Sequence, residues 1–136
     1  MKWAVELHEE FDAEFGYLAK DVQDELLAQA AVIECFGPQT GRPRVDTLNG
    51  SCYANMKELR FDADGGVWRV AFAFDPRRHA VLLVAGDKSG GGEKTFYRHL
   101  IKKADERYGR HLLSLQADQK VVRKGKGAKK HENPLR

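Results

Sequence analysis

The run Val67–Phe74 alternates strictly between large apolar residues and other residues, and it constrains the fold more than any other part of the chain. Four apolar side chains share one face: Trp68, Val70, Phe72 and Phe74. A period of two residues is typical of a β-strand with one buried face. The opposite face carries Arg69 beside the small residues Ala71 and Ala73. This pattern predicts a concave floor into which one long cationic side chain reaches.

The runs on either side of this strand also read as strands. In the preceding run Leu59 and Phe61 would share the core face, which leaves Met56, Glu58 and Arg60 on the other face. If the two strands pair antiparallel, Glu58, Arg60 and Arg69 converge on one surface. The following run, Ala80–Ala85, is apolar throughout, so we expect it to be the central strand, and Lys88 follows its end.

The N-terminal third predicts a strand followed by two helices. Lys2–Leu7 alternates as a strand does, and Phe11, Phe15 and Leu18 then follow the spacing of a helix face. Asp21 is the expected N-cap of a second helix, which Gly37-Pro38 ends. Its apolar stripe is Val22, Leu26, Ala30 and Ile33. The two helices would form a hairpin over one face of the sheet, and Gly37–Ser51 reads as a loop from its turn residues.

The C-terminal third predicts a further helix and a basic tail. The apolar residues Phe96, Leu100, Ala104 and Tyr108 repeat every fourth position, and a last helical piece is expected over His111–Gln119. The element order βααβββα indicates an α+β fold with a mostly antiparallel sheet. We expect one domain over residues 1–119 and a flexible tail over residues 120–136.

Charge is distributed unevenly along the chain. Residues 1–34 hold two lysines against nine acidic residues, whereas residues 120–136 hold seven basic residues against one glutamate. A cationic middle and C-terminal segment suit a polyanionic partner such as nucleic acid, with the acidic helices facing away from it. The simpler interpretation of the same composition is that the C-terminal segment only increases the solubility of the protein.

Other sequence features bear on the cellular compartment and on whether the protein binds a metal. The chain has no apolar run long enough for a membrane span, and its N-terminus lacks the pattern of a signal peptide. Two cysteines, Cys35 and Cys52, suit a reducing cytoplasm. The five histidines are scattered without metal-ligand spacing, so we expect no metal and no cofactor.

Three segments resemble the RelE/ParE superfamily of toxins, and most closely its phage-derived, HigB-like branch. They are GPQTGRPRVDTLNGSCYANMKELR, WRVAFAFDPRRHAVLLVAGDKSGGG and FYRHLIKKADERYGRHL, and the resemblance covers about residues 2–116. It implies a RelE-like fold and a toxin of a type II toxin–antitoxin system. The implied activity is a ribosome-dependent mRNA endoribonuclease that cleaves by metal-independent attack of the 2′-OH on the scissile phosphate.

The resemblance also implies roles for particular residues. Three residues match basic family positions that act on the phosphate: Arg60, Arg69 and Lys88. The guanidinium group of arginine suits this role because it can bind two phosphate oxygens at once. Glu58 stands where RelE has a lysine, so it would act as the base or orient Arg60, and Tyr97 and His99 are acid or base candidates. Further basic residues are expected to bind RNA: Lys57, Lys94, Arg123, Lys124 and Lys126.

The implied partners are a cognate helix-turn-helix antitoxin, the ribosome and mRNA, with no membrane. Two alternatives stay open. One is a ParE-like toxin that inhibits DNA gyrase and lacks the nuclease residues. The other is a non-catalytic binding module or co-repressor that acts together with its antitoxin.

Overall fold

The sheet has five strands in the order β1-β5-β4-β3-β2, and the computed structural model describes residues 2–128, with the side chains of residues 2–119. The strands are β1 (Ala4–Leu7), β2 (Val45–Thr47), β3 (Met56–Ala63), β4 (Gly66–Phe74) and β5 (His79–Asp87). Strand β1 pairs parallel to β5, and the other neighbours pair antiparallel. The α+β class and the mostly antiparallel sheet are confirmed.

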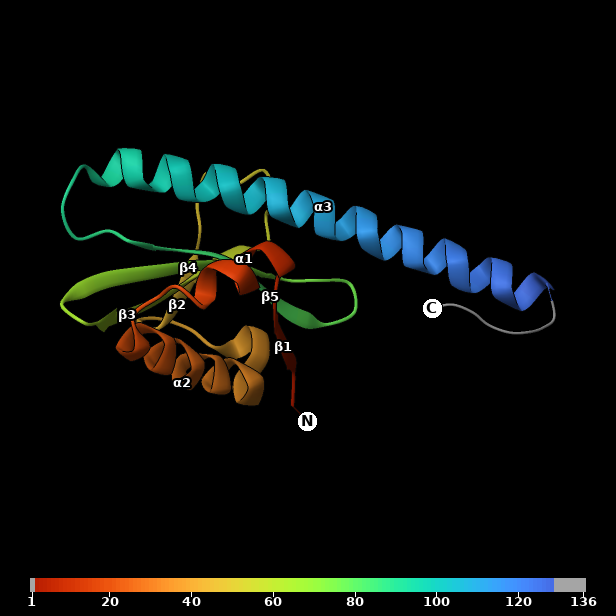
Figure 1. Cartoon of the computed structure of the whole chain (residues 1–136), viewed down its shortest axis with the longest axis horizontal. Helices are drawn as coiled ribbons and strands as arrows, with labels where there is room; N and C mark the ends of the chain where they lie inside the picture. Colours follow the sequence, from red (N-terminus) through yellow and green to blue (C-terminus); the bar gives the residue numbers. More distant parts are fainter. Residues whose placement is uncertain (1, 129–136) are drawn as a thin grey trace.

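Helices cover both faces of this sheet. They are α1 (Glu9–Phe15), α2 (Lys20–Phe36) and α3 (Glu93–Ala128), with a short 3₁₀ turn, η1 (Gly37–Gln39), after α2. Helices α2 and α3 lie on opposite sides of the sheet, and the C-terminal part of α3 extends past its edge (Figure 1). Phe11 of α1 and the apolar residues of α2 are buried in one core, and α3 covers the other core.

The alternation of β3 and β4 divides the buried side chains into two cores. The core under α1 and α2 contains Leu59, Val70 and Phe72, with Trp68 and Phe74 partly buried against it. The second core lies under α3 and includes Met56, Ala71 and Ala73. The face with the two alanines was predicted to be a concave floor, and that prediction is wrong because α3 packs on most of it. Small residues at these positions let the helix approach the sheet closely.

Strand β4, rather than the predicted Ala80–Ala85, is the middle strand of the sheet. Strand β5 is apolar on both faces because it lies between β1 and β4 and is covered by helices on both sides, so Ala80–Val84 are all buried. Strand β2 lies in the segment predicted to be a loop. It pairs Val45–Thr47 with Lys57–Leu59. A strand of three residues is too short for a period of two to be recognised in the sequence.

Two helix boundaries also differ from the prediction. Helix α2 begins at Lys20 and has Ala19, not Asp21, at its N-cap, with no side-chain cap bond. The predicted final piece, His111–Gln119, belongs to α3, which is continuous through Gly109. One glycine costs a helix only about 1 kcal/mol, which tertiary packing offsets. A Cβ at this position would lie 3.0 Å from the Tyr53 hydroxyl. Glycine therefore permits close contact between α3 and Tyr53.

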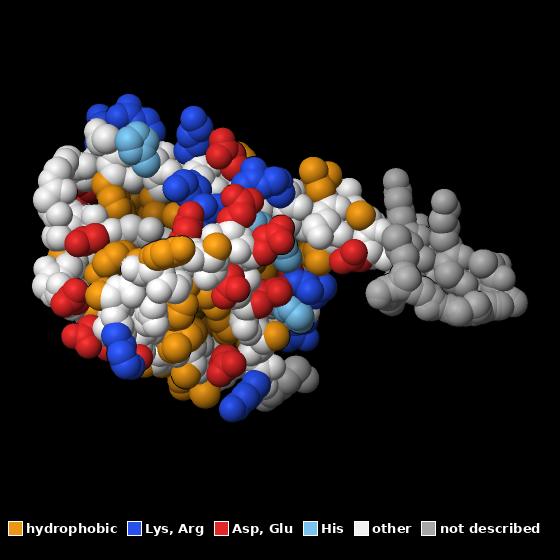
Figure 2. Space-filling view, viewed as in Figure 1, with side chains coloured by type: hydrophobic (Ala, Val, Ile, Leu, Met, Phe, Trp, Pro, Cys, Tyr) orange, Lys and Arg blue, Asp and Glu red, His pale blue; other side chains and the backbone are white. Residues whose placement is uncertain are grey.

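The first turn of α1 carries Glu9, Glu10 and Asp12, and the face seen in Figure 2 presents acidic and basic side chains together. Among residues 2–128, no helix combines the length and the apolar composition that a bilayer crossing requires. The boundary predicted at residue 120 falls within α3, and residues 129–136 of the predicted tail lie outside the described part of the chain.

Candidate active site

The pairing of β3 with β4 brings the predicted cationic residues together. Arg60 and Arg69 are direct cross-strand partners in the antiparallel register. Glu58 lies two residues before Arg60 on the same strand and therefore on the same face. Because α3 begins at Glu93 and covers the rest of this face, these three side chains lie at the end of the sheet beside the first turns of the helix.

Glu58 is the centre of the cluster and is 4% exposed. Its Oε1 accepts a hydrogen bond from the Tyr97 hydroxyl at 2.7 Å, and its Oε2 accepts one from Arg60 Nη2 at 3.0 Å. Arg69 Nε lies 3.7 Å from Glu58 Oε1 and donates to the Tyr97 hydroxyl at 3.3 Å. Glu58 is therefore held by one phenol and two guanidinium groups, which offset the cost of burying a carboxylate.

The close approach of α3 places Tyr97 in this cluster. Gly86 on β5 lies beneath the helix, and a Cβ there would meet the Phe96 ring at 2.8 Å. A larger residue at position 86 would push the start of α3 away from the sheet. The Tyr97 hydroxyl would then lose contact with Glu58, so the glycine serves the geometry of the site.

The cluster shifts the ionisation of its members. Burial lowers the pKa of Arg60, but the hydrogen bond and charge of Glu58 and the charge of Asp46 outweigh burial, and the net shift is upward. Burial and the hydrogen bond to Glu58 raise the pKa of Tyr97, with Arg69 acting in the opposite direction. At neutral pH the phenol is therefore a proton donor within the cluster, and the guanidinium stays charged.

Lys88 completes a pocket of about 380 Å³ whose lining carries both cations and carboxylates. Its Nζ donates to Glu93 Oε1 at 2.8 Å and lies 5.6 Å from the centre of the Tyr97 ring. The hydrogen bond from Lys88 is the main cause that lowers the pKa of Glu93. The pocket is lined by Asp46, Thr47, Leu48, Asn49, Glu58, Arg60, Lys88, Glu93 and Tyr97.

The structure brings five of the six expected catalytic residues together: Glu58, Arg60, Arg69, Lys88 and Tyr97. The sixth, His99, is exposed on α3 and does not line the pocket. Arg69 was expected on an open surface, but its side chain is only 12% exposed, because Tyr97 and the Trp68 carbonyl engage it. Its structural role is therefore larger than the sequence indicated.

The expected RNA-binding residues are more dispersed. Lys57 is half-buried and, by the alternation of β3, lies on the face opposite Glu58. Lys94 is exposed in the first turn of α3. Arg123, Lys124 and Lys126 belong to α3, but their side chains lie outside the described ones.

Sequence reasoning missed the two further charged residues of the pocket. Asp46 on β2 lies 3.5 Å from Arg60 Nη2, and Glu93 holds Lys88. Asp46 was missed because β2 was taken for a loop. The alternation of Val45-Asp46-Thr47 is the signal that indicates this residue, once the pairing with β3 is known.

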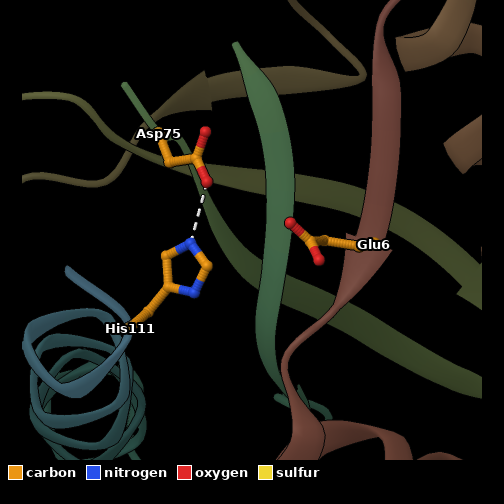
Figure 3. A group of neighbouring side chains, drawn as sticks. All are labelled: Glu6, Asp75 and His111. Atoms are coloured by element: carbon orange, nitrogen blue, oxygen red, sulfur yellow. Dashed lines mark hydrogen bonds and ion pairs between the residues drawn. The ribbon is translucent and has the colours of Figure 1, made fainter. Parts of the chain in front are cut away.

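A second group of titratable residues lies at the other end of the sheet. Glu6, Asp75 and His111 have ligand atoms within 4.8 Å of one another (Figure 3). Their chemistry suits a metal, but the guanidinium of Arg77 already lies among them. Its Nη2 is 2.7 Å from Asp75 Oδ2 and also bonds Glu6. His111 Nε2 lies 2.8 Å from the same Asp75 oxygen, so the group works as an ionic network that ties α3 to β1 and the β4–β5 turn.

Comparisons with known proteins found related sequences. The model of the phage-derived Gp49-like protein family matches residues 13–109. Two Mycobacterium tuberculosis proteins named as candidate toxins are similar to the chain. HigB2 is 38% identical over 125 residues, which are 91% of this chain and 61% of the relative. HigB3 is 42% identical over 100 residues, which are 74% of this chain and 85% of the relative.

One solved structure is also similar, that of a mutant of the E. coli toxin RelE in the free state. It aligns with a TM-score of 0.49 and 13% identity, over 76% of this chain and 97% of that one.

The fold and the pocket define a small α+β protein with a site of paired cations and carboxylates at one end of its sheet. The chain belongs to the phage-derived Gp49-like family, with HigB-type proteins as its relatives, and the HigB-like assignment made from the sequence is confirmed. It spans 61% of the length of HigB2, the longer of the two relatives.

Proposed function

We propose that this protein is the toxin of a type II toxin–antitoxin system and cleaves mRNA on the ribosome. Family membership and the HigB-type relatives support the class of protein. The observation that carries the proposed activity is the cluster in which Arg60, Arg69 and Lys88 surround the Glu58–Tyr97 pair. This combination offers cations, a buried carboxylate and a phenol in one pocket.

The cations suit the charge that develops during RNA cleavage. Attack of a 2′-OH on the adjacent phosphate gives a crowded phosphorane that carries more negative charge than the substrate. Arg60 and Lys88 line the pocket, and Arg69 lies beside them, so their donors would bind the phosphate oxygens. These groups are held in place before substrate arrives, and such preorganised donors contribute most to transition-state stabilisation.

Glu58 and Tyr97 supply the proton chemistry in this proposal. Glu58 accepts the proton of the attacking 2′-OH, either directly or through the Tyr97 hydroxyl that is bonded to it. The 2′ oxygen then bonds phosphorus, and the bond to the 5′ oxygen breaks. Lys88, which lines the same pocket, would donate the proton that this leaving oxygen takes up. The products are a 2′,3′-cyclic phosphate and a 5′-hydroxyl, and every step uses side chains of the chain itself.

The partners follow from the proposed function. We expect a helix-turn-helix antitoxin that binds the free toxin tightly in the cytoplasm, and a ribosome that presents the mRNA. The basic segment from residue 120 onward would strengthen association with ribosomal RNA. Two acidic residues of α1 do not face away from the helix that carries this segment, because Glu10 pairs with Arg110 and Glu14 with Arg107 on α3.

Induced expression in cells tests the proposal against the alternative of gyrase inhibition. We expect loss of translation and cleaved transcripts whose new 5′ ends lie within coding regions. A DNA-damage response with intact transcripts would indicate a ParE-like toxin instead. Growth without either effect would favour a non-catalytic module. The purified complex with antitoxin should fail to cleave ribosome-bound mRNA that the refolded free toxin cleaves.

A further inference from the structure

Helix α2 is apolar over more of its circumference than the sheet covers. Residues 26–33 form a run without a charged residue, in which Gln29 is the only polar one. The core buries Leu26, Ala30 and Ile33 of this run. A helix that packs against a core with one face normally presents charged and polar residues to solvent, whereas a helix that is apolar all round is normally buried. The composition of α2 is therefore that of a helix covered on two sides.

The outer face of α2, which points away from the sheet, consists of exposed apolar residues: Leu27, Ala28, Ala31 and Cys35. Leu27 is 50% exposed, and Phe36 at the end of the helix is 60% exposed. Single exposed apolar residues are common, but a continuous patch with a polar rim is typical of an interaction site. Hydrophobic side chains are exposed in the region of Figure 2 where Figure 1 places α2.

The charges beside the outer face indicate what kind of partner fits it. Helix α2 carries one lysine, Lys20, against four acidic residues: Asp21, Asp24, Glu25 and Glu34. The lysine is already paired with Asp24 at 2.9 Å. A second copy of the chain would bring these like charges together, whereas a helix with lysine or arginine beside its apolar stripe would pair with them. Charge complementarity therefore favours a basic amphipathic helix over self-association.

The outer face is also separate from the candidate active site. Helices α2 and α3 lie on opposite sides of the sheet, and the pocket with Lys88 and Tyr97 lies beside the first turns of α3 (Figure 1). An apolar surface with acidic neighbours does not suit RNA, which is a polyanion. Contacts with substrate therefore do not account for this surface, and a protein partner does.

We propose that the outer face of α2 binds the antitoxin through an amphipathic helix of that protein. The apolar side of the antitoxin helix packs on Leu27, Ala31 and Cys35, and its basic residues pair with Asp21 and Asp24. The small side chains on α2 let the two helix axes approach closely, and Leu27 is the large residue that the partner buries. The inference rests on the proposed toxin–antitoxin function and adds the docking surface to it.

The two cysteines of the chain provide a test on the wild-type protein. Cys35 lies on the outer face of α2, and Cys52 lies on the α3 side of the molecule, where its amide donates to Asp105. Both are free and exposed. The toxin alone and its purified complex with the co-expressed cognate antitoxin are treated with iodoacetamide, and mass spectrometry follows each cysteine. Complex formation should slow alkylation of Cys35 about tenfold or more, because a thiol buried in an interface reacts only when the interface opens. Cys52 should keep its rate.

Matched variants test the apolar contact. Leu27→Lys should weaken antitoxin binding about tenfold or more, since the loss of one buried leucine contributes at least that factor. Leu113→Lys, the same change at a 65% exposed position of α3, should leave the affinity unchanged. Each variant alone should still arrest growth, because neither residue lines the pocket, but Leu27→Lys should escape rescue by the antitoxin.

A second pair of variants tests the charge of the partner. Asp24→Lys reverses an exposed charge of α2, and Glu106→Lys reverses an exposed charge of α3. Asp24→Lys should weaken antitoxin binding several-fold more than Glu106→Lys does, because it places a cation against the basic residues of the partner. Equal effects of the two reversals would overturn the assignment of a basic partner helix.

The other outcomes separate the inference from the proposed function. Equal alkylation of Cys35 in the complex and in the free toxin would overturn the inference and leave the toxin–antitoxin function intact. So would protection of Cys52 alone, equal affinities of Leu27→Lys and Leu113→Lys, or protection of Cys35 that appears when the free toxin is concentrated, which would assign the face to a second copy. A folded wild-type chain whose induction leaves growth unaffected would overturn the proposed function and the inference with it.

Discussion

The hydroxyl of Tyr97 lies 2.7 Å from Oε1 of Glu58, and this bond joins the first turns of α3 to strand β3. The two residues are 39 positions apart in the chain. The same hydroxyl accepts a hydrogen bond from Arg69, so a single oxygen connects the buried carboxylate with a cation of the site. Glu58 is thereby fixed in orientation beside the pocket.

Tyr97→Phe removes this oxygen and leaves the ring in place. Glu58 Oε1 then loses a donor, and we expect a loss of about 1–2 kcal/mol in the free energy of unfolding. Cleavage should slow by roughly ten- to a hundredfold, because proton transfer and the position of Arg69 both depend on the hydroxyl. Urea unfolding and single-turnover cleavage measure the two effects. Tyr17→Phe, at a fully open position, is the control and should change neither quantity.

Arg69→Ala should affect both activity and stability. Its guanidinium lies beside the buried Glu58 and contacts the Trp68 carbonyl, so its removal should cost more than an exposed substitution does, about 1–3 kcal/mol. Cleavage should fall about a hundredfold or more. Arg69→Lys should restore only part of the rate, since an ammonium cannot bind two oxygens in a fixed plane. Full cleavage by a folded Arg69→Ala variant would show that the site lies elsewhere.

Glu93→Gln should release Lys88. The lysine is held at 2.8 Å by an exposed carboxylate that lines the same pocket, and substrate phosphate must compete with that carboxylate. We therefore expect tighter binding of programmed ribosomes by a few-fold and little change in stability. Titration of toxin in the cleavage assay gives the affinity. Weaker binding by this variant, with Glu106→Gln at an exposed position of α3 outside the pocket unchanged as the control, would mean that Glu93 positions Lys88 for substrate.

Asp75 predicts a specific pH dependence of stability. Burial raises the pKa of its carboxyl, but the hydrogen bonds from His111, Arg77 and the His79 amide outweigh burial, so the net shift is downward. A depressed folded-state pKa stabilises the fold above the unfolded value, near 4, and this contribution is lost as the pH falls through the folded value. Asp75→Asn should therefore cost roughly 3 kcal/mol at pH 7 and progressively less as the pH falls below the unfolded-state value.

Urea unfolding across this pH range measures the Asp75 contribution. The exposed substitution Asp21→Asn controls for the change in net charge. It should leave the loss of unfolding free energy at low pH unchanged. A difference between wild type and Asp75→Asn that stays constant from pH 7 to pH 3 would contradict the assigned shift.

Deleting residues 129–136 tests the expected role of the basic segment. Each phosphate neutralised on a single strand contributes about −0.7 to the slope of log affinity against log salt. The deletion removes Lys129, Lys130 and Arg136, so the slope for ribosome binding should become shallower. The melting temperature should stay close to that of the full chain. An unchanged slope would exclude these residues from the interaction.

The alternating strands could be predicted from the sequence because their pattern follows from local geometry. A period of two residues assigns Leu59, Val70 and Phe72 to one face and Glu58, Arg60 and Arg69 to the other. This division needs no knowledge of the tertiary structure. The same reasoning placed Glu58, Arg60 and Arg69 on one surface before their contacts were known, whereas Tyr97 was named only through the family resemblance.

The parts that could not be predicted depend on long-range packing. Whether Ala71 and Ala73 form an open floor or a buried surface depends on where α3 lies, and the helix pattern does not state which face it covers. Strand β2 forms because Val45–Thr47 pairs with the edge of β3, and a pattern of three residues alone could not identify it. The network of Glu6, Asp75 and His111 joins residues from three distant segments, and no spacing in the sequence connects them.

The most direct test of the account is single-turnover cleavage of mRNA on programmed ribosomes by wild type and Arg60→Ala, with the chemistry of the new ends determined. We expect wild type to produce a 2′,3′-cyclic phosphate and a 5′-hydroxyl, and we expect folded Arg60→Ala to cleave roughly a hundredfold more slowly or worse. A 3′-hydroxyl and a 5′-phosphate, or equal rates for the two proteins, would contradict the proposed site and mechanism.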